Sequence, residues 1–254
     1  MQEHFSKFTD ATGAIEWQRD AEENETGVAL GCVAVQGERI SYPTPYLCEG
    51  QVEDWLSGLM AHQQGALRTR LSEAIGAFLE QPRDKFVLGQ CAQLAITSSQ
   101  IWWTTEVNNC FDRLEVGNEG AMKDYLNTCV QGLALWSSMV LGELTAEQRT
   151  KLKTCITIDV HARDIVAKLV AERVESANAF AWQSQLKYVW DDERRDCFIE
   201  ICDAEFKYSY EYVGNPGRLV ITALTDRCYI TLTQASKGFD FASLPAYGTL
   251  PCFL

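Results

Sequence analysis

Side chains that could act in catalysis are few in this chain of 254 residues, and they do not form a known constellation. His161 is the best-placed acid–base candidate, because Arg163 and Asp164 follow it closely. No nucleophile accompanies it in a recognisable spacing. We therefore expect His161 to serve in helix packing or in a salt bridge, and Arg163 and Asp164 to pair with neighbouring elements.

Phosphoryl transfer is the second chemistry to consider. It needs a glycine-rich loop that ends in Gly-Lys-Ser or Gly-Lys-Thr, which holds the phosphates and the Mg²⁺ ion. The sequence has no such triplet, and Lys237-Gly238 has the two residues in reverse order with no glycine loop before them. No Walker B carboxylate or arginine finger can be assigned. We therefore expect no ATPase activity from this chain alone.

Metal and disulfide chemistry are also disfavoured. The ten cysteines are spread through apolar segments without a C-x-x-C motif, and none of the three histidines lies near a cysteine in a ligand spacing. The acidic turn 191–193 lacks converging ligands. We expect no metal site, and reduced, mostly buried thiols in a cytosolic protein.

Charge and hydropathy exclude two classes of partner. A net charge of −13 disfavours nucleic acid, because binding phosphates requires clustered Lys and Arg. No run of 18 apolar residues is present, so no membrane partner is expected. The first thirty residues have no apolar segment typical of a secretory signal.

The elements that would position these residues change type along the chain. Residues 1–25 are polar and predicted to be frayed, and 28–35 with 39–42 predict a hairpin that Pro43 and Pro45 end. Apolar residues at steps of three and four then predict helices, and Thr145 with Gln148 predicts a capping box. The predicted helices cover residues 51–81, 92–114, 122–140, 146–176 and 179–190.

Beyond residue 195 the period changes to two. This pattern predicts strands at 198–202, 206–212, 219–222 and 228–233. Tyr208, Tyr210 and Tyr212 would share one face of the second strand, as sheet core rather than as a stacking platform. The predicted fold is mainly α: an elongated helical bundle followed by a small β segment.

Seven phrases in this chain resemble, in wording, order and spacing, the dynein heavy chains, and the axonemal outer-arm chains above all. They match the junction between the mechanical linker and the first AAA+ module, over residues 28–235. The phrases are Val52-Glu-Asp-Trp-Leu56, Gln100-Ile-Trp-Trp-Thr-Thr-Glu106, Ala121-Met-Lys-Asp-Tyr125, Thr157-Ile-Asp-Val-His-Ala-Arg-Asp164, Ser184-Gln-Leu-Lys-Tyr-Val-Trp190, Glu211-Tyr-Val-Gly-Asn215 and Arg218–Gln234.

This resemblance implies four regions. Residues 1–27 would be a flexible acidic N-terminus, and 28–190 the C-terminal helical region of the linker. Residues 191–235 would be the first strands and adenine loop of an incomplete first AAA+ module, with its small β segment. Residues 236–254 would be a poorly ordered tail outside the family, from an alternative splice, a frameshift or an incomplete gene model, so that the chain stops before the Walker A loop.

The resemblance also assigns an adenine-binding loop. Its residues would be Leu219, Val220, Ile221, Thr222, Ala223 and Leu224, and Ala223 stands where the family has proline. Burying ~100 Å² of apolar surface yields only ~2.5 kcal/mol, whereas a millimolar dissociation constant needs about 4 kcal/mol. The parent family uses ATP and Mg²⁺, but we expect this chain to bind neither tightly.

The parent would be an ATP-driven, minus-end-directed microtubule motor of cilia and flagella. This segment would supply its linker and the loop of its first ATP site. The implied partners are dynein intermediate, light-intermediate and light chains and microtubules, and the implied location is the cytoplasm, the cytoskeleton and the ciliary axoneme. Two alternatives stay open: a non-catalytic helical protein that binds dynein subunits, or an inactive truncation product.

Overall fold

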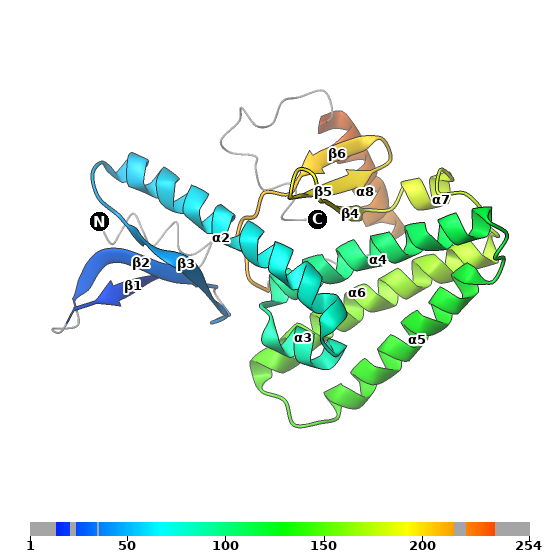
Figure 1. Ribbon diagram of the computed structural model, residues 1–254, viewed down its shortest axis with the longest axis horizontal. Helices are drawn as coiled ribbons and strands as arrows, with labels where there is room; N and C mark the ends of the chain where they lie inside the picture. The colour runs from blue at the N-terminus through cyan, green and yellow to red at the C-terminus, as the bar shows by residue number, and fades with distance from the viewer. Residues whose placement is uncertain (1–13, 21–23, 35, 216–221, 237–254) are drawn as a thin grey trace. The chain divides into compact units, whose positions relative to one another are not determined.

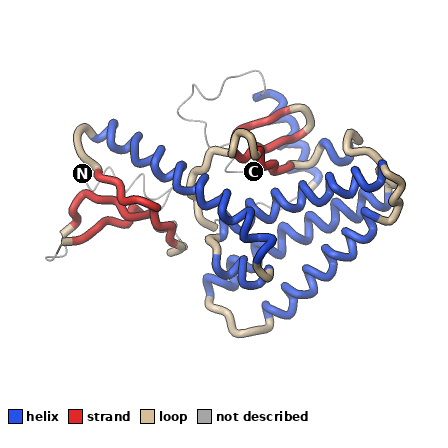
Figure 2. The backbone as a smooth tube through the Cα atoms, viewed as in Figure 1, coloured by secondary structure: helices blue, strands red, loops and turns tan. Residues whose placement is uncertain are grey.

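The computed structural model describes residues 14–20, 24–34, 36–215 and 222–236. These residues form seven helices and two three-stranded sheets (Figure 1, Figure 2), which confirms the predicted mainly α class with a small β segment. They divide into two compact units. The first unit runs to Ala95 and includes Ser209–Asn215, and the second comprises Ile96–Tyr208 and the last helix.

The first unit opens with an antiparallel sheet in the order β1 (Ala14–Arg19), β2 (Glu25–Val33) and β3 (Arg39–Leu47). The predicted hairpin is confirmed as β2 and β3. The prediction of a frayed segment was wrong for β1, because pairing with β2 satisfies its backbone groups.

Strand β3 continues through Pro43 and Pro45, so the prediction that these prolines end it was wrong. Within the described residues β3 pairs only with β2 and is therefore an edge strand. Its pairing is irregular at this point, where Ala29 is opposite Tyr46 and Gly31 is opposite Ser41. An edge strand with an irregular register tolerates residues that lack a backbone N–H.

Two helices complete the first unit. Helix α2 (Val52–Glu80) ends before Pro82, as predicted, and Pro82 is the N-cap of the short helix α3 (Arg83–Gly89), which was not predicted. Phe86 of α3 is fully buried and packs edge-on against Phe78 of α2, with ring centroids 5.2 Å apart. This aromatic contact explains why so short a helix persists.

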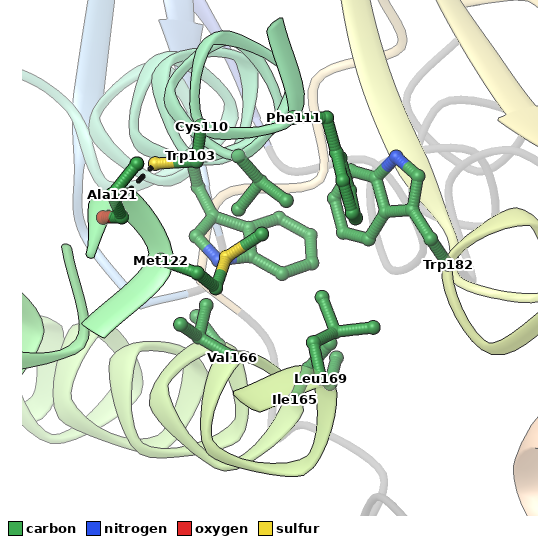
Figure 3. Close-up of a cluster of buried hydrophobic side chains, with 11 residues drawn as sticks. Trp103, Cys110, Phe111, Ala121, Met122, Ile165, Val166, Leu169 and Trp182 are labelled. Carbon is green, nitrogen blue, oxygen red and sulfur yellow. Dashed lines mark hydrogen bonds between the residues drawn. The ribbon is translucent and has the colours of Figure 1, made fainter. Parts of the chain in front are cut away.

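The second unit is built on α4 (Ala92–Glu115), α5 (Ala121–Val140) and α6 (Ala146–Ala171), all close to their predicted bounds except that α6 ends before residue 176. The capping box is confirmed. The amide of Gln148 donates to the Thr145 hydroxyl at 3.2 Å, and the amide of Thr145 donates to the Gln148 side chain at 3.1 Å. The three helices share one buried core (Figure 3).

A second sheet follows α7 (Phe180–Gln183), in the order β4 (Lys187–Asp191), β5 (Asp196–Ile201) and β6 (Ala204–Lys207). The predicted helix 179–190 was wrong beyond Gln183, because residues from Lys187 pair with β5 in a regular antiparallel ladder. The strand at 198–202 is confirmed by β5.

The predicted strand 206–212 was wrong beyond Lys207. Tyr210 has φ of 54°, which interrupts an extended backbone. All three tyrosines of this stretch are nonetheless buried, although all of them lie outside the strands.

The predicted strand 228–233 was also wrong, because these residues belong to helix α8 (Ala223–Ser236). The strand was predicted because this segment contains several β-branched residues, which favour strands. Thr231 and Thr233 direct their hydroxyls to carbonyls one turn earlier, those of Arg227 and Tyr229, as threonines in helices do. Of the run 219–222, Thr222 is not in a strand, and residues 219–221 lie outside the described residues.

Candidate functional site

The predicted adenine loop is described only at its end. Leu219, Val220 and Ile221 lie outside the described residues, and the structure does not test their assignment. Thr222 precedes α8, and Ala223 and Leu224 are its first two residues. The Leu224 side chain is 71% exposed.

Thr222 is the N-cap of α8. Its hydroxyl accepts a hydrogen bond from the amide of Thr225 at 3.3 Å, and the Thr225 hydroxyl accepts one from the amide of Thr222 at 2.8 Å. This reciprocal pair satisfies two amides that a helix start leaves free. Ala223 therefore occupies the first helical position, where proline is favoured because its fixed φ suits a helix.

A polar contact site lies in the first unit, where the segment Ser209–Asn215 returns to it; we call this segment the strap. Gln93, at the start of α4, bonds to the strap through both the nitrogen and the oxygen of its side-chain amide. Its Nε2 donates to the carbonyl of Glu211 at 2.7 Å, and its Oε1 accepts from the amide of Val213 at 3.1 Å. The Gln93 side chain thus pairs with the strap backbone as a neighbouring strand would.

Tyr212 forms the second attachment of the strap. It is fully buried, and its hydroxyl donates to the backbone carbonyl of Glu38 at 3.1 Å. The Glu38 carboxylate is itself buried and accepts from the amide of Ala92, the first residue of α4, at 2.8 Å. A carboxylate at this position satisfies an unpaired amide and complements the helix dipole.

Gly214 lets the strap lie close to the first sheet's hairpin. Its φ is 68°, and a Cβ at this position would collide with the Cβ of Ala34. Sequence reasoning singled out the phrase around Gly214 but missed its partners. Gln93 and Val213 are 120 positions apart, and no local pattern could have joined them.

The second unit is organised by an aromatic cluster at the centre of Figure 3. Trp182 of α7 is 1% exposed and meets Trp103 of α4 edge-on, with ring centroids 5.1 Å apart. Its indole Nε1 donates to Asn108 Oδ1 at 3.0 Å. Lys187 of β4 is also buried and reaches Gln183 of α7 at 3.0 Å and Glu200 of β5 at 3.5 Å. Helices and sheet of this unit are thereby joined around α7.

A second tryptophan joins α5 to α6. Trp136 is fully buried, and its Nε1 donates to Asp159 Oδ2 at 2.6 Å. A charge-assisted bond of this kind is stronger than a neutral one and fixes how the two helices face each other. Asp159 is 23 positions from Trp136 and on another helix, so the local sequence gave no indication of this pairing.

His161 has no catalytic surroundings among the described residues. Burial lowers its pKa below the ordinary 6.5, while the negative charges of Asp226 and Asp164 act in the opposite direction. Arg163 pairs with its neighbour Asp164 at 2.7 Å rather than with another element. This setting suits a histidine of α6 that packs against neighbouring residues in its neutral form.

The remaining candidate groups are structural within the described part of the chain. The Asp191 carboxylate accepts from the amides of Glu193 and Arg194, which closes the turn between β4 and β5. The described cysteines are free thiols, and burial raises the pKa of Cys197 to about 12. In the described ranges no three metal-ligating side chains gather, and no helix is long and apolar enough to cross a bilayer.

Comparison with known proteins gives a match to a family model over a short segment and matches to individual proteins over most of the chain. Residues 208–246 match the family model described as the hydrolytic ATP binding site of the dynein motor region, a match that extends past Ala235. Human dynein axonemal heavy chain 9 is 48% identical over 235 residues, and a ciliary dynein beta chain from Tripneustes gratilla is 46% identical over 235 residues.

These alignments cover nearly all of this chain and little of the relatives. Each takes in 92% of the chain but only 5% of the relative. The same shares hold for the flagellar outer-arm beta chain of Chlamydomonas reinhardtii, which is 42% identical over 234 residues. The aligned 235 residues exceed the 208 positions of 28–235, so the likeness also includes part of 1–27 or 236–254.

Proposed function

Because the chain belongs to the dynein heavy-chain family, we propose that it is the segment in which the mechanical linker meets the first AAA+ module of an axonemal motor. The observation that carries the proposal is the place where the ATP-site match begins within the longer match. Identity to axonemal heavy chains covers 92% of the chain, while the ATP-site model begins only at residue 208, just after β6. The long helices of this chain, α2 and α4 to α6, therefore precede the region that matches the ATP-site model, which supports the proposal.

The helices of the second unit suit a lever. The helices α4, α5 and α6 have 24, 20 and 26 residues, or roughly 30–39 Å at ~1.5 Å per residue. Their shared core includes fully buried Val107 and Val166. A core of this kind has low compressibility, so a displacement at one end of the helices moves the other.

The loop 219–224 is proposed to contact the adenine of ATP in the complete motor, with Mg²⁺ and the phosphates held by residues of other segments. The chain itself contributes no phosphate-binding triplet. We therefore propose that the isolated chain neither hydrolyses ATP nor retains it tightly. In the complete motor, the segment would act with microtubules and the other dynein subunits in the axoneme.

A chimaera tests this role. Residues 14–236 of this chain would replace the corresponding segment of a ciliary heavy chain, and ATP hydrolysis and microtubule gliding would be measured. We expect both activities to be retained at rates within about threefold of the parent. A folded chimaera that has lost both would refute the proposal.

The isolated chain provides a complementary measurement. We expect no magnesium-dependent turnover of ATP and no saturable binding with a Kd below about 1 mM, because such a Kd would need a binding free energy of more than about 4 kcal/mol. Sub-micromolar ATP binding by the purified chain would show that the nucleotide site is organised differently.

A further inference from the structure

We propose that Gln93 is a positioning residue: with Glu38 and Tyr212 it fastens the strap to the first unit and so couples the lever to the chain that enters the ATP-binding region. The mechanical consequence rests on the proposed function. The fastening itself rests only on the contacts of the first unit.

Gln93 is suited to this task because the nitrogen and the oxygen of its side-chain amide both form hydrogen bonds, and both partners are backbone groups. The side chain is 7% exposed, so little water can replace the bonds to Glu211 and Val213. Removal of the amide would leave two part-buried backbone groups without this partner, which costs more than the bonds themselves contribute.

The other attachment acts on the same end of α4. Tyr212 bonds to the carbonyl of Glu38, and the carboxylate of Glu38 bonds to Ala92. Ala92 and Gln93 are consecutive, so both attachments of the strap converge on the first turn of one helix. A movement of that turn is therefore transmitted to the strap at two points.

The strap is held in a conformation that the chain would not adopt unaided. Tyr210 and Gly214, at either side of its centre, both have positive φ, of 54° and 68°. A non-glycine residue in this region is strained and persists only where surrounding contacts fix it. Loss of the contacts should therefore release the strap rather than leave it in place.

The position of Gln93 in the chain explains why these contacts would affect the residues that follow the strap. Helix α4 passes from the first unit into the second between Ala95 and Ile96, and the chain returns to the first unit at Ser209. The hydrogen bonds of Gln93 thus link the segment where the chain leaves the first unit to the segment where it returns. Only residues 216–221 then separate the strap from Thr222, so fastening the strap limits the positions open to the chain that follows it.

Hydrogen exchange in the purified 254-residue chain tests the fastening. In Gln93→Met we expect the amide of Val213 to exchange at least about tenfold faster, the equivalent of about 1.4 kcal/mol. Amides of α4 in the second unit, such as that of Val107, should keep their rates. Gln131→Met, on an exposed position of α5, is the matched control and should change neither rate.

Two gentler variants keep the test decisive if Gln93→Met disturbs folding. Gln93→Glu retains an acceptor for Val213 but loses the donor to Glu211, and Tyr212→Phe removes one hydroxyl and keeps the ring. Each should accelerate the Val213 amide by a smaller factor than Gln93→Met. Unchanged Val213 exchange in all three variants would overturn the proposal.

The coupling is tested in the chimaeric heavy chain. Gln93→Met should lower gliding velocity at least about threefold while kcat for ATP hydrolysis stays within about twofold, because loosening should affect transmission and not the chemical step. Unchanged velocity despite faster Val213 exchange would overturn the positioning role, and so would equal losses of velocity and kcat. If the parent chimaera itself has neither activity, the proposed function fails, while the exchange result still decides the fastening.

Discussion

The strap and the tryptophan core are held together by opposite means. The strap has a backbone that carries strain, and a few directed hydrogen bonds hold it: those of Gln93 to the strap backbone and that of the Tyr212 hydroxyl to the carbonyl of Glu38. The core around Trp182 depends on buried apolar surface, and one indole bond orients it. Apolar packing resists deformation in every direction, whereas a few hydrogen bonds can open together. The comparison assigns stiffness to the helices and adjustability to the strap.

The largest effect should come from the core. Trp182→Ala should destabilise the second unit by about 3–5 kcal/mol, because it removes a fully buried indole and leaves a cavity. Denaturant unfolding measures this loss. Phe180→Ala in the same short helix is the control, since Phe180 is 71% exposed and its loss should change stability by less than about 0.5 kcal/mol. Equal effects would mean that the cluster does not stabilise this unit.

The strap should respond to a single methyl group. Gly214→Ala should destabilise the first unit by about 1–3 kcal/mol in denaturant unfolding, because the residue has positive φ and its Cβ would collide with Ala34. Gly37→Ala separates the two causes. Gly37 also has positive φ, but a Cβ added there would meet no atom within 4 Å, so only the backbone cost of roughly 1 kcal/mol should appear. If Gly37→Ala cost as much, close approach to Ala34 would be unimportant.

Helix α8 should gain stability from a proline at its first position. Ala223→Pro should stabilise the helix by about 0.4–1 kcal/mol, because the unfolded chain loses freedom and the first helical position needs no N–H. Thermal unfolding followed by circular dichroism would detect the gain. Leu224→Pro, one position later, is the control and should give less or none. A loss of stability in Ala223→Pro would contradict the assignment of Thr222 as the cap.

The smallest effect should depend on pH. Burial lowers the pKa of His161, against the charges of Asp164 and Asp226, so the folded state binds its proton less readily than the unfolded state does. Its contribution to stability is therefore complete above the ordinary pKa of 6.5 and is lost as the pH falls from there toward the lower folded value. His161→Gln should flatten this acid-side loss in melts between pH 7 and pH 5. An unchanged slope would rule out His161 as its source.

Local pattern predicted the parts of the molecule that are regular over many residues. The apolar spacing of α2, α4, α5 and α6 was sufficient, and Thr145 with Gln148 marked the start of α6. Pattern was insufficient where the competing conformations are close in energy. Residues 228–233 of α8 include β-branched types that favour strands, yet they form a helix. The predicted helix 179–190 extended into residues that pair with β5, and this pairing decided their structure.

Three features could be read from the sequence by itself: the resemblance to the family, the long helices and the absence of a phosphate-binding triplet in these residues. Each depends on residues close together in the chain, as shared phrases, apolar spacing or a short motif. Tertiary structure alone decided the partners of Gln93, Tyr212 and Trp182. Their contacts join residues 74 to 174 positions apart, and a hydrogen bond over such a separation depends on how the whole chain folds, not on the residues beside it.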